Sequence, residues 1–296
     1  MAKSRRRKSV GTVAIPFMVT FLIALIALGG TGYYFYQKLT NKQRELIPIV
    51  SATASISDAD INEILFVLDP NDKETQQPAV MLLRFDPVRK QEFCLGIPLT
   101  LQLDHEGKQE SVGTCFTNHG INTLKNDLSK LLDQKIDRYM QFDSTGFQKM
   151  MAMLNNVSFP VTIRDKGIRP SEVSVELEGS QFETLLTSKK YSTERERNSV
   201  IGMSCAQLIR QIEGERIAAN LDNYFSTLIN SVKTDINVMD FSQHRHAISY
   251  VFEHGNGVSR GVTLDFSNSD DNALILEPAF VESLKYTFSQ KSDDES

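Results

Sequence analysis

The sequence predicts an α/β fold, with a layered domain whose central sheet is flanked by helices, plus one N-terminal transmembrane helix. Three observations carry this prediction. Short apolar runs closed by Pro, Asn or Asp alternate with segments of helical periodicity from residue 60 onward. The composition, with 41% apolar and 23% charged residues, is that of a folded protein with a full core. An uncharged stretch of 25 residues, at 12–36, precedes them.

The uncharged stretch is long enough to cross a membrane, since about 20 helical residues span a hydrocarbon core of ~30 Å. Five basic residues stand among the first eight, and positively charged flanks stay in the cytoplasm. Tyr33, Tyr34 and Tyr36 close the stretch, where aromatic rings favour the membrane interface. We therefore expect a single-pass anchor in a cell membrane, with a cytoplasmic N-terminus and an extracellular main domain. A cleaved signal peptide is the competing interpretation, but its apolar region would be shorter and followed directly by small residues.

Charge and composition divide the chain into five parts. Without the five N-terminal basic residues the chain holds 27 basic and 37 acidic residues. Such an acidic body argues against nucleic acid as a partner, because that binding depends on neutralising phosphates. The three cysteines form no CxxC pattern, so we predict buried free thiols. The expected parts are a basic cytoplasmic tail at 1–11, a transmembrane helix at 12–36, a linker at 37–59, the folded domain at 60–288 and a polar tail at 289–296.

Strand and helix signals alternate along the folded domain. Continuous apolar runs bounded by turn residues predict buried strands, and apolar residues at helical spacing predict helices. The first three strands should be neighbours in one sheet, with a hairpin between the second and third. The expected strands lie at 64–69, 79–87, 93–98, 137–143 and 159–163, and the expected helices at 121–132, 145–154 and 200–228, the last one broken near Gly214. Residues 273–288 hold a further helix or strand.

By itself the sequence shows no catalytic motif: it has no P-loop, no GxGxxG after a strand and no HExxH. His244 and His246 would share one face of a strand, with His254 following. Zinc sites need three or four ligands, so we predict solvated histidines there and no metal site. We predict that the mixed-sign segment ERER, at 194–197, is a solvated helix start rather than an anion site.

Several segments nevertheless match a known pattern. The longest is IDRYMQFDSTGFQKMMAMLNNVSFPV at 136–161, against IDYYVxVDFxGFxxLVDxLGGVxVxVP. Shorter ones are QQPAVMLLRFDP at 76–87, against RSDTIMLLRxDP, and GIPLTL at 96–101, against SIPRDT. The chain thus resembles the LytR-CpsA-Psr (LCP) family of bacterial cell-envelope proteins over nearly all of residues 60–288. The resemblance implies an LCP-like layered domain with a central mixed sheet flanked by helices, behind a single N-terminal anchor.

Active members of this family are Mg²⁺-dependent phosphotransferases, which move glycopolymers from a polyprenyl-pyrophosphate carrier to the cell wall. That chemistry calls for arginines around the pyrophosphate and carboxylates around the metal. In this chain most of those positions are substituted, so the resemblance implies no catalytic residue, no metal ligand and no cofactor. The substituted positions are Asn71, Gln76, Pro78, Leu99, Thr100 and Thr187. The remnants of a phosphate-binding site are Asp69, Lys189, Arg195 and Arg197.

We therefore expect a degenerate family member, a pseudoenzyme that binds lipid-linked polymer or wall components or acts as a scaffold. Its expected partners are the membrane, a polyprenyl-linked glycopolymer or peptidoglycan, and envelope proteins. Two alternatives stay open: an active Mg²⁺-dependent phosphotransferase with relocated cations, and an envelope signalling or regulatory protein, since the family was first regarded as transcriptional attenuators. Convergence of Asp69, Lys189, Arg195 and Arg197 on one pocket would favour the enzyme.

Overall fold

The computed structural model describes residues 55–154, 156–164, 167–254, 258–268 and 273–289. The residues from Ser55 onward form one compact unit. The predicted transmembrane segment at 12–36 lies outside the described residues, as do the basic tail and most of the linker. Within the described ranges, no helix combines the length and the apolar character that a bilayer crossing requires.

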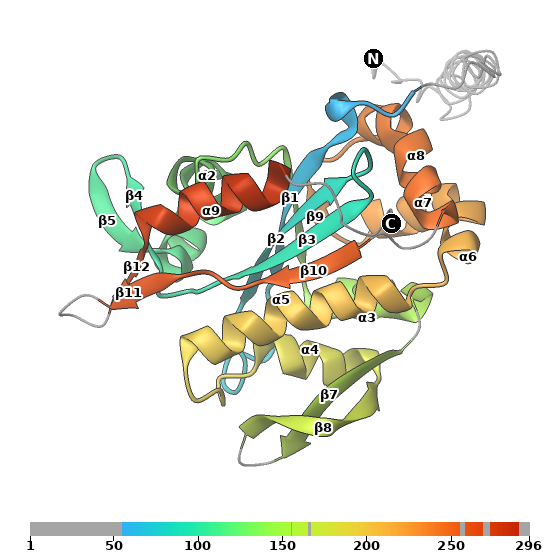
Figure 1. The fold of residues 1–296 in the computed structure, drawn as a ribbon. Helices are drawn as coiled ribbons and strands as arrows, with labels where there is room; N and C mark the ends of the chain where they lie inside the picture. Colours follow the sequence, from blue (N-terminus) through green and yellow to red (C-terminus); the bar gives the residue numbers. More distant parts are fainter. Residues whose placement is uncertain (1–54, 155, 165–166, 255–257, 269–272, 290–296) are drawn as a thin grey trace, which may run out of the picture. The chain divides into compact units, whose positions relative to one another are not determined.

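A six-stranded mixed sheet forms the centre of this unit (Figure 1). Strand β1 pairs antiparallel with β2 and parallel with β6, and β3 pairs antiparallel with β2 and parallel with β10. The α/β class and the mixed sheet are confirmed, and so is the predicted hairpin between the second and third strands. In sheet order the strands are β10 (Val258–Val262), β3 (Gln91–Ile97), β2 (Ala79–Asp86), β1 (Asn62–Leu68), β6 (Arg138–Phe142) and β9 (Lys233–Thr234).

Helices cover both faces of the sheet, as the continuous apolar runs predicted. On one face, Leu65 and Val67 of β1 pack with α2 (Val112–Leu132) and α9 (Pro278–Ser289). On the other face, Leu68 packs with three further helices and Phe66 lies against the same cluster. Those helices are α3 (Ser144–Leu154), α4 (Gly179–Thr187) and α5 (Glu194–Gln211).

Helix α5 lies directly on β3 and β10 because glycines line the contact. A Cβ atom on Gly202 would lie 2.8 Å from the carbonyl oxygen of Cys94, and one on Gly96 would lie 2.3 Å from that of Asn198. Neither position has room for a side chain. The close contact sets the position of α5 over the sheet and with it the position of Arg197 on that helix.

The remaining elements differ in part from the predictions. Residues 200–228 form three helices instead of two, and a further helix follows them. Helix α2 begins nine residues earlier than predicted and turns at Gly120, whose φ of 79° separates two helical halves. The helices are α6 (Gly214–Ala219), α7 (Leu221–Ile229) and α8 (Val238–Glu253). The satellite strands are β4 (Gln102–His105), β5 (Lys108–Ser111), β7 (Val157–Arg164), β8 (Gly167–Leu177), β11 (Phe266–Asn268) and β12 (Leu274–Leu276), with a 3-10 turn η1 (Asp58–Asp60) before β1.

Candidate functional site

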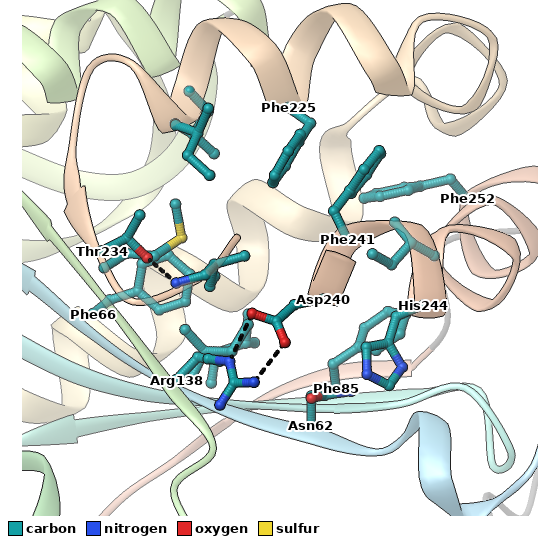
Figure 2. Close-up of a pocket in the computed structure, with 17 residues that line it drawn as sticks. Asn62, Phe66, Phe85, Arg138, Phe225, Thr234, Asp240, Phe241, His244 and Phe252 are labelled. Carbon is teal, nitrogen blue, oxygen red and sulfur yellow. Dashed lines mark hydrogen bonds and ion pairs between the residues drawn. The ribbon is translucent and has the colours of Figure 1, made fainter. Parts of the chain in front are cut away.

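An apolar cavity of about 330 Å³ lies between the sheet and helices α7 and α8 (Figure 2). Its floor comes from alternate residues of adjacent strands, because side chains two apart on a strand share one face. Its cover is aromatic: Phe225 of α7 stacks on Phe241 of α8 with ring centroids 4.0 Å apart. The floor residues are Ile64, Phe66, Leu83, Phe85 and Met140.

One wall of this cavity carries an ion pair. Arg138 of β6 donates to both carboxylate oxygens of Asp240, over 3.1 Å from Nε and 2.5 Å from Nη2 (Figure 2). Asn237 caps α8 and places Asp240 in its first turn, and Arg138 lowers the pKa of the Asp240 carboxyl through this hydrogen bond. The side chain of His244, one turn further along α8, points into the same wall. The cavity therefore combines an apolar body with a polar edge near the start of β1.

A second apolar cavity, of about 160 Å³, lies on the same face of the sheet under α3, α4 and α5. It shares Phe66 and Leu83 with the first cavity. The two cavities thus adjoin along β1, whose seven residues extend over about 20 Å at ~3.3 Å per residue. We call the two cavities together the apolar slot. Its elongated shape and apolar lining fit an extended hydrocarbon chain better than a compact polar molecule.

Arg197 of α5 lies next to Leu186, behind the lining of the second cavity rather than within it. Its Nη2 donates to the carbonyl oxygens of Pro78 and Leu186, over 2.6 and 3.3 Å, and Leu186 itself lines the second cavity. The residue is only 1% exposed, and burial lowers the pKa of its guanidinium. Its Nε and Nη1 atoms are buried and have no hydrogen-bond partner among the described residues. The segment ERER does begin a helix, but the predicted solvation is wrong for Arg197, because the helix turns this side chain inward.

The other three remnants contact different partners. Asp69 forms an ion pair with Lys73 and lines a separate polar hollow of about 340 Å³. Lys189 donates through Nζ to the carbonyl oxygens of Lys73 and Glu74, over 2.6 and 3.3 Å. Arg195 lies over the ring of Phe266 and pairs with Asp265 at 3.3 Å.

The structure thus brings three of the four remnants to one segment. Asp69 begins this segment, which runs to Pro78; Lys189 and Arg197 bind carbonyls within it, whereas Arg195 contacts the β11 region. Among the described residues, Asp69 lines the polar hollow, and none of the four lines either cavity of the apolar slot, so they do not converge on one pocket.

The residues at the substituted positions make main-chain hydrogen bonds and apolar packing contacts. Half-buried Leu99 packs against the core under α2 and accepts a hydrogen bond from the amide of Gly113 over 2.9 Å. Thr187 is buried and donates to the carbonyl of Glu183. The other four make contacts through the main chain. The amide of Asn71 donates to the hydroxyl of Ser144, and Gln76 forms an isolated antiparallel β-bridge with Ser188. The carbonyl oxygens of Pro78 and Thr100 accept hydrogen bonds from Arg197 and from the amide of Leu274. None of these side chains offers a charge or a carboxylate.

The residues present fit Mg²⁺ poorly. Magnesium binds oxygen ligands in near-octahedral geometry and prefers carboxylates. The carboxylate of Asp69 is engaged by the ammonium of Lys73, and Pro78 and Thr100 occupy the positions that the resemblance assigns to further acidic groups.

No protein-family model matches the sequence, and no curated protein matches it either. The fold, however, is similar to several solved structures. A protein from Eubacterium siraeum has a TM-score of 0.66 at 17% identity, over 80% of this chain and 95% of that one. TagV from B. subtilis has a TM-score of 0.57 at 16% identity, over 77% and 95% of the two chains. TagT, solved bound to LI-WTA, has a TM-score of 0.57 at 13% identity, over 80% and 93%.

The fold is LCP-like. TagT and TagV are LCP proteins, so their similarity supports the fold that the sequence resemblance implied. At these identities the likeness establishes the fold alone, and the loss of the family's catalysis stays a prediction.

One group of side chains was missed by the sequence reasoning. His105, Glu110 and His119 bring one ligand atom each within 4.8 Å of one another, although no two of them are adjacent in the sequence and they match no metal-binding motif. The histidines that the sequence did single out, His244 and His246, lie on helix α8 and not on a strand. Residues two apart on a helix do not share a face, so these two are not placed to bind one ion together.

Proposed function

We propose that this chain is a membrane-anchored, LCP-like protein of bacterial cell-envelope assembly, which binds a polyprenyl-linked polymer without transferring it. The observation that carries the proposal is the apolar slot along β1, together with the buried guanidinium of Arg197, which donates to the carbonyl oxygen of Leu186, a residue of the slot's lining. This arrangement matches a ligand with a long apolar tail and an anionic head.

The tail accounts for most of the expected affinity. Each methylene removed from water contributes about 0.8 kcal/mol, so even part of a polyprenyl chain in the slot binds substantially. Aromatic and branched side chains line most of both cavities and give such a chain an apolar surface everywhere except at the Arg138–Asp240 wall. Arg197 retains two unfilled donors that suit phosphate oxygens, because a guanidinium binds them as a planar fork.

The expected absence of polymer transfer rests on the substituted family positions. A phosphotransferase must neutralise charge that develops on the leaving phosphate, and each charge-assisted contact contributes about 1.5–3 kcal/mol. With Leu99 and Gln76 at two of the family's arginine positions, transfer would be slower by about two to four orders of magnitude. Lys189 is already bound to two carbonyl oxygens, and Arg195 contacts the β11 region.

The proposed location follows from the N-terminal segment. The uncharged residues 12–36 would hold the chain in the bacterial cell membrane as a single-pass anchor, with the folded domain extracellular. There it would meet peptidoglycan, lipid-linked glycopolymer and other envelope proteins. The structure of TagT bound to LI-WTA shares this fold and supports the ligand class by analogy. A protease added outside intact cells should remove the folded domain, and full protection of an accessible epitope would contradict this topology.

The binding test uses residues 55–296, the compact unit, with a polyprenyl monophosphate as the probe. Leu83→Trp fills the junction of the two cavities and should weaken binding at least tenfold. Tyr286→Trp, an aromatic exchange at an exposed site on α9, is the matched control and should bind like wild type. Arg197→Met should weaken binding of the phosphate but not of the uncharged polyprenol. Equal affinities of wild type and Leu83→Trp would refute the slot as the binding site.

The alternative, an active phosphotransferase, draws support from one observation. Asp69 persists at the end of β1 and lines the polar hollow together with Asp143. Incubation of residues 55–296 with a polyprenyl pyrophosphate and Mg²⁺ separates the two functions. We expect no phosphate release. Turnover that disappears on Lys189→Ala or Arg197→Ala would replace the non-catalytic proposal by the enzymatic one.

A further inference from the structure

A compact group of ligand-type side chains lies on the opposite face of the sheet from the apolar slot. It belongs to the β4–β5 hairpin and to helix α2, which lie side by side in Figure 1. His105, Glu110 and His119 place one imidazole nitrogen or carboxylate oxygen each within 4.8 Å of the others. These residues have no part in the lipid-binding function proposed above.

The hairpin register places the first two ligands. Leu103 of β4 pairs with Glu110 of β5, so both point to one face of the hairpin, and His105 is two residues beyond Leu103 on the same face. Leu103 is buried in the core beneath α2. The face that carries His105 and Glu110 is therefore the face that packs towards the helix.

The turn at Gly120 places the third ligand. His119 is the last residue of the first helical half, and the positive φ of Gly120 reverses the chain after it. As a result, the Sγ atom of Cys115 lies 3.9 Å from Oδ2 of Asp127 in the second half. Twelve residues of straight helix would separate the two by about 18 Å. The two halves thus fold together around the hairpin face.

Further contacts orient the ligands. Asp127 is buried, and its Oδ2 lies 2.7 Å from Nδ1 of His105, which fixes the ring and leaves Nε2 for another partner. Lys130 donates to the other oxygen of Asp127 over 2.9 Å. A carboxylate behind a histidine is the usual outer contact of a metal-bound imidazole.

Glu110 and His119 complete the group. Oε1 of Glu110 is buried and makes no hydrogen bond among the described residues, although Nε2 of His119 lies only 3.3 Å away. The rings of His105 and His119 approach with centroids 4.2 Å apart. His119 is at the surface, which gives an ion a path to the group.

We propose that His105, Glu110 and His119 bind one zinc-class divalent ion through two imidazole nitrogens and one carboxylate oxygen. Two imidazoles select zinc over magnesium or calcium, which prefer oxygen. Metal–ligand bonds of about 2.1 Å require ligand atoms about 3.4 Å apart in a tetrahedron. The present separation of Glu110 and His119 meets this value, and small rotations of the side chains bring in His105. Three protein ligands leave a fourth position for water, as in open zinc sites.

The experiment uses the full chain, purified in detergent without a histidine tag and stripped with a chelator. Zn²⁺ binding is measured by calorimetry, and Co²⁺ serves as a spectroscopic probe of tetrahedral coordination. We expect one equivalent of Zn²⁺ and a Co²⁺ spectrum of tetrahedral type. Glu110→Gln and His119→Ala should weaken Zn²⁺ binding at least tenfold, and Asp127→Asn about tenfold. Millimolar Mg²⁺ should not compete.

His254→Ala is the matched control, because His254 is also a surface histidine that stacks on a ring, that of Tyr250. It should bind Zn²⁺ like wild type. The melting temperature of each stripped variant checks folding, and Glu110→Gln, a near-isosteric change, decides the outcome if His119→Ala unfolds. Absence of Zn²⁺ binding by the wild-type chain, or undiminished binding by Glu110→Gln, would overturn the proposal.

Discussion

Glu92 on β3 should make the folded unit less stable as pH rises from about 4.5 to 7. The residue is 3% exposed, and its Oε2 is buried without a hydrogen-bond partner among the described residues. Its neighbours across the sheet are Phe85 on β2 and Ser259 on β10, neither of which carries a charge. Burial in this position raises the pKa of the Glu92 carboxyl from 4.5 to about 7.

The direction of the effect follows from proton binding. Below pH 4.5 the carboxyl of Glu92 is protonated in both the folded and the unfolded chain, so it has no influence on their balance. Between pH 4.5 and 7 the unfolded chain releases the proton while the folded chain keeps it, which favours unfolding progressively. Above pH 7 the carboxyl of Glu92 is ionised in both the folded and the unfolded chain, and the loss of folding stability is complete. The rise of the Glu92 pKa from 4.5 to about 7, at about 1.36 kcal/mol per pH unit, amounts to a loss of stability of about 3 kcal/mol.

The assay is urea unfolding of residues 55–296 at several pH values from 4.5 to 8.5. The free energy of unfolding of Glu92→Gln, relative to wild type, should rise by about 3 kcal/mol across this range, because glutamine keeps the shape and does not titrate. Glu215→Gln, which removes one carboxyl at an exposed position of α6, is the matched control. A Glu92→Gln difference that is independent of pH, or that grows towards low pH, would refute the reasoning.

Three further predictions concern packing, each checked by urea unfolding of residues 55–296. Arg84→Met should lower the free energy of unfolding by about 3–5 kcal/mol, since it removes the partner 2.6 Å from buried Glu63; a loss below about 1 kcal/mol would contradict this. Gly202→Ala should lower it by about 1–3 kcal/mol, because the new methyl group meets the Cys94 carbonyl; an unchanged stability would show that α5 shifts freely. Leu65→Ala, at a fully buried position of β1, should lower it by about 2–5 kcal/mol, and a smaller loss would mean that the core closes over the gap.

The central strands were predictable because their signal is local. Residues 64–69, 79–87 and 93–98 are continuous apolar runs ended by turn residues, and only a sheet covered on both faces buries such runs. The hairpin between β2 and β3 was predictable for the same reason, since a short polar connection joins two strands of matching length. The long match at 136–161 likewise appears in the structure as a strand followed by a helix.

The environment of Arg197 was not predictable from its neighbours in the sequence. The mixed charges of ERER indicate a solvated helix start, and α5 does begin there. Successive residues of a helix, however, point about 100° apart, so adjacent charged residues face different surroundings. Arg197 is enclosed between Pro78 and Leu186, which are distant in the sequence and are brought there by β2 and α4.

For the apolar slot and for the His105–Glu110–His119 group, the sequence likewise determined some features and the tertiary structure determined others. The sequence by itself determined that Ile64 and Phe66 are apolar, that their strand is buried, and that a histidine precedes Gly120. Only the tertiary structure decided that a space remains above those strand residues, because cavities depend on how side chains from separate helices fit together. It also decided that two histidines and a glutamate meet, because a hairpin register and a reversal at Gly120 act on different parts of the chain.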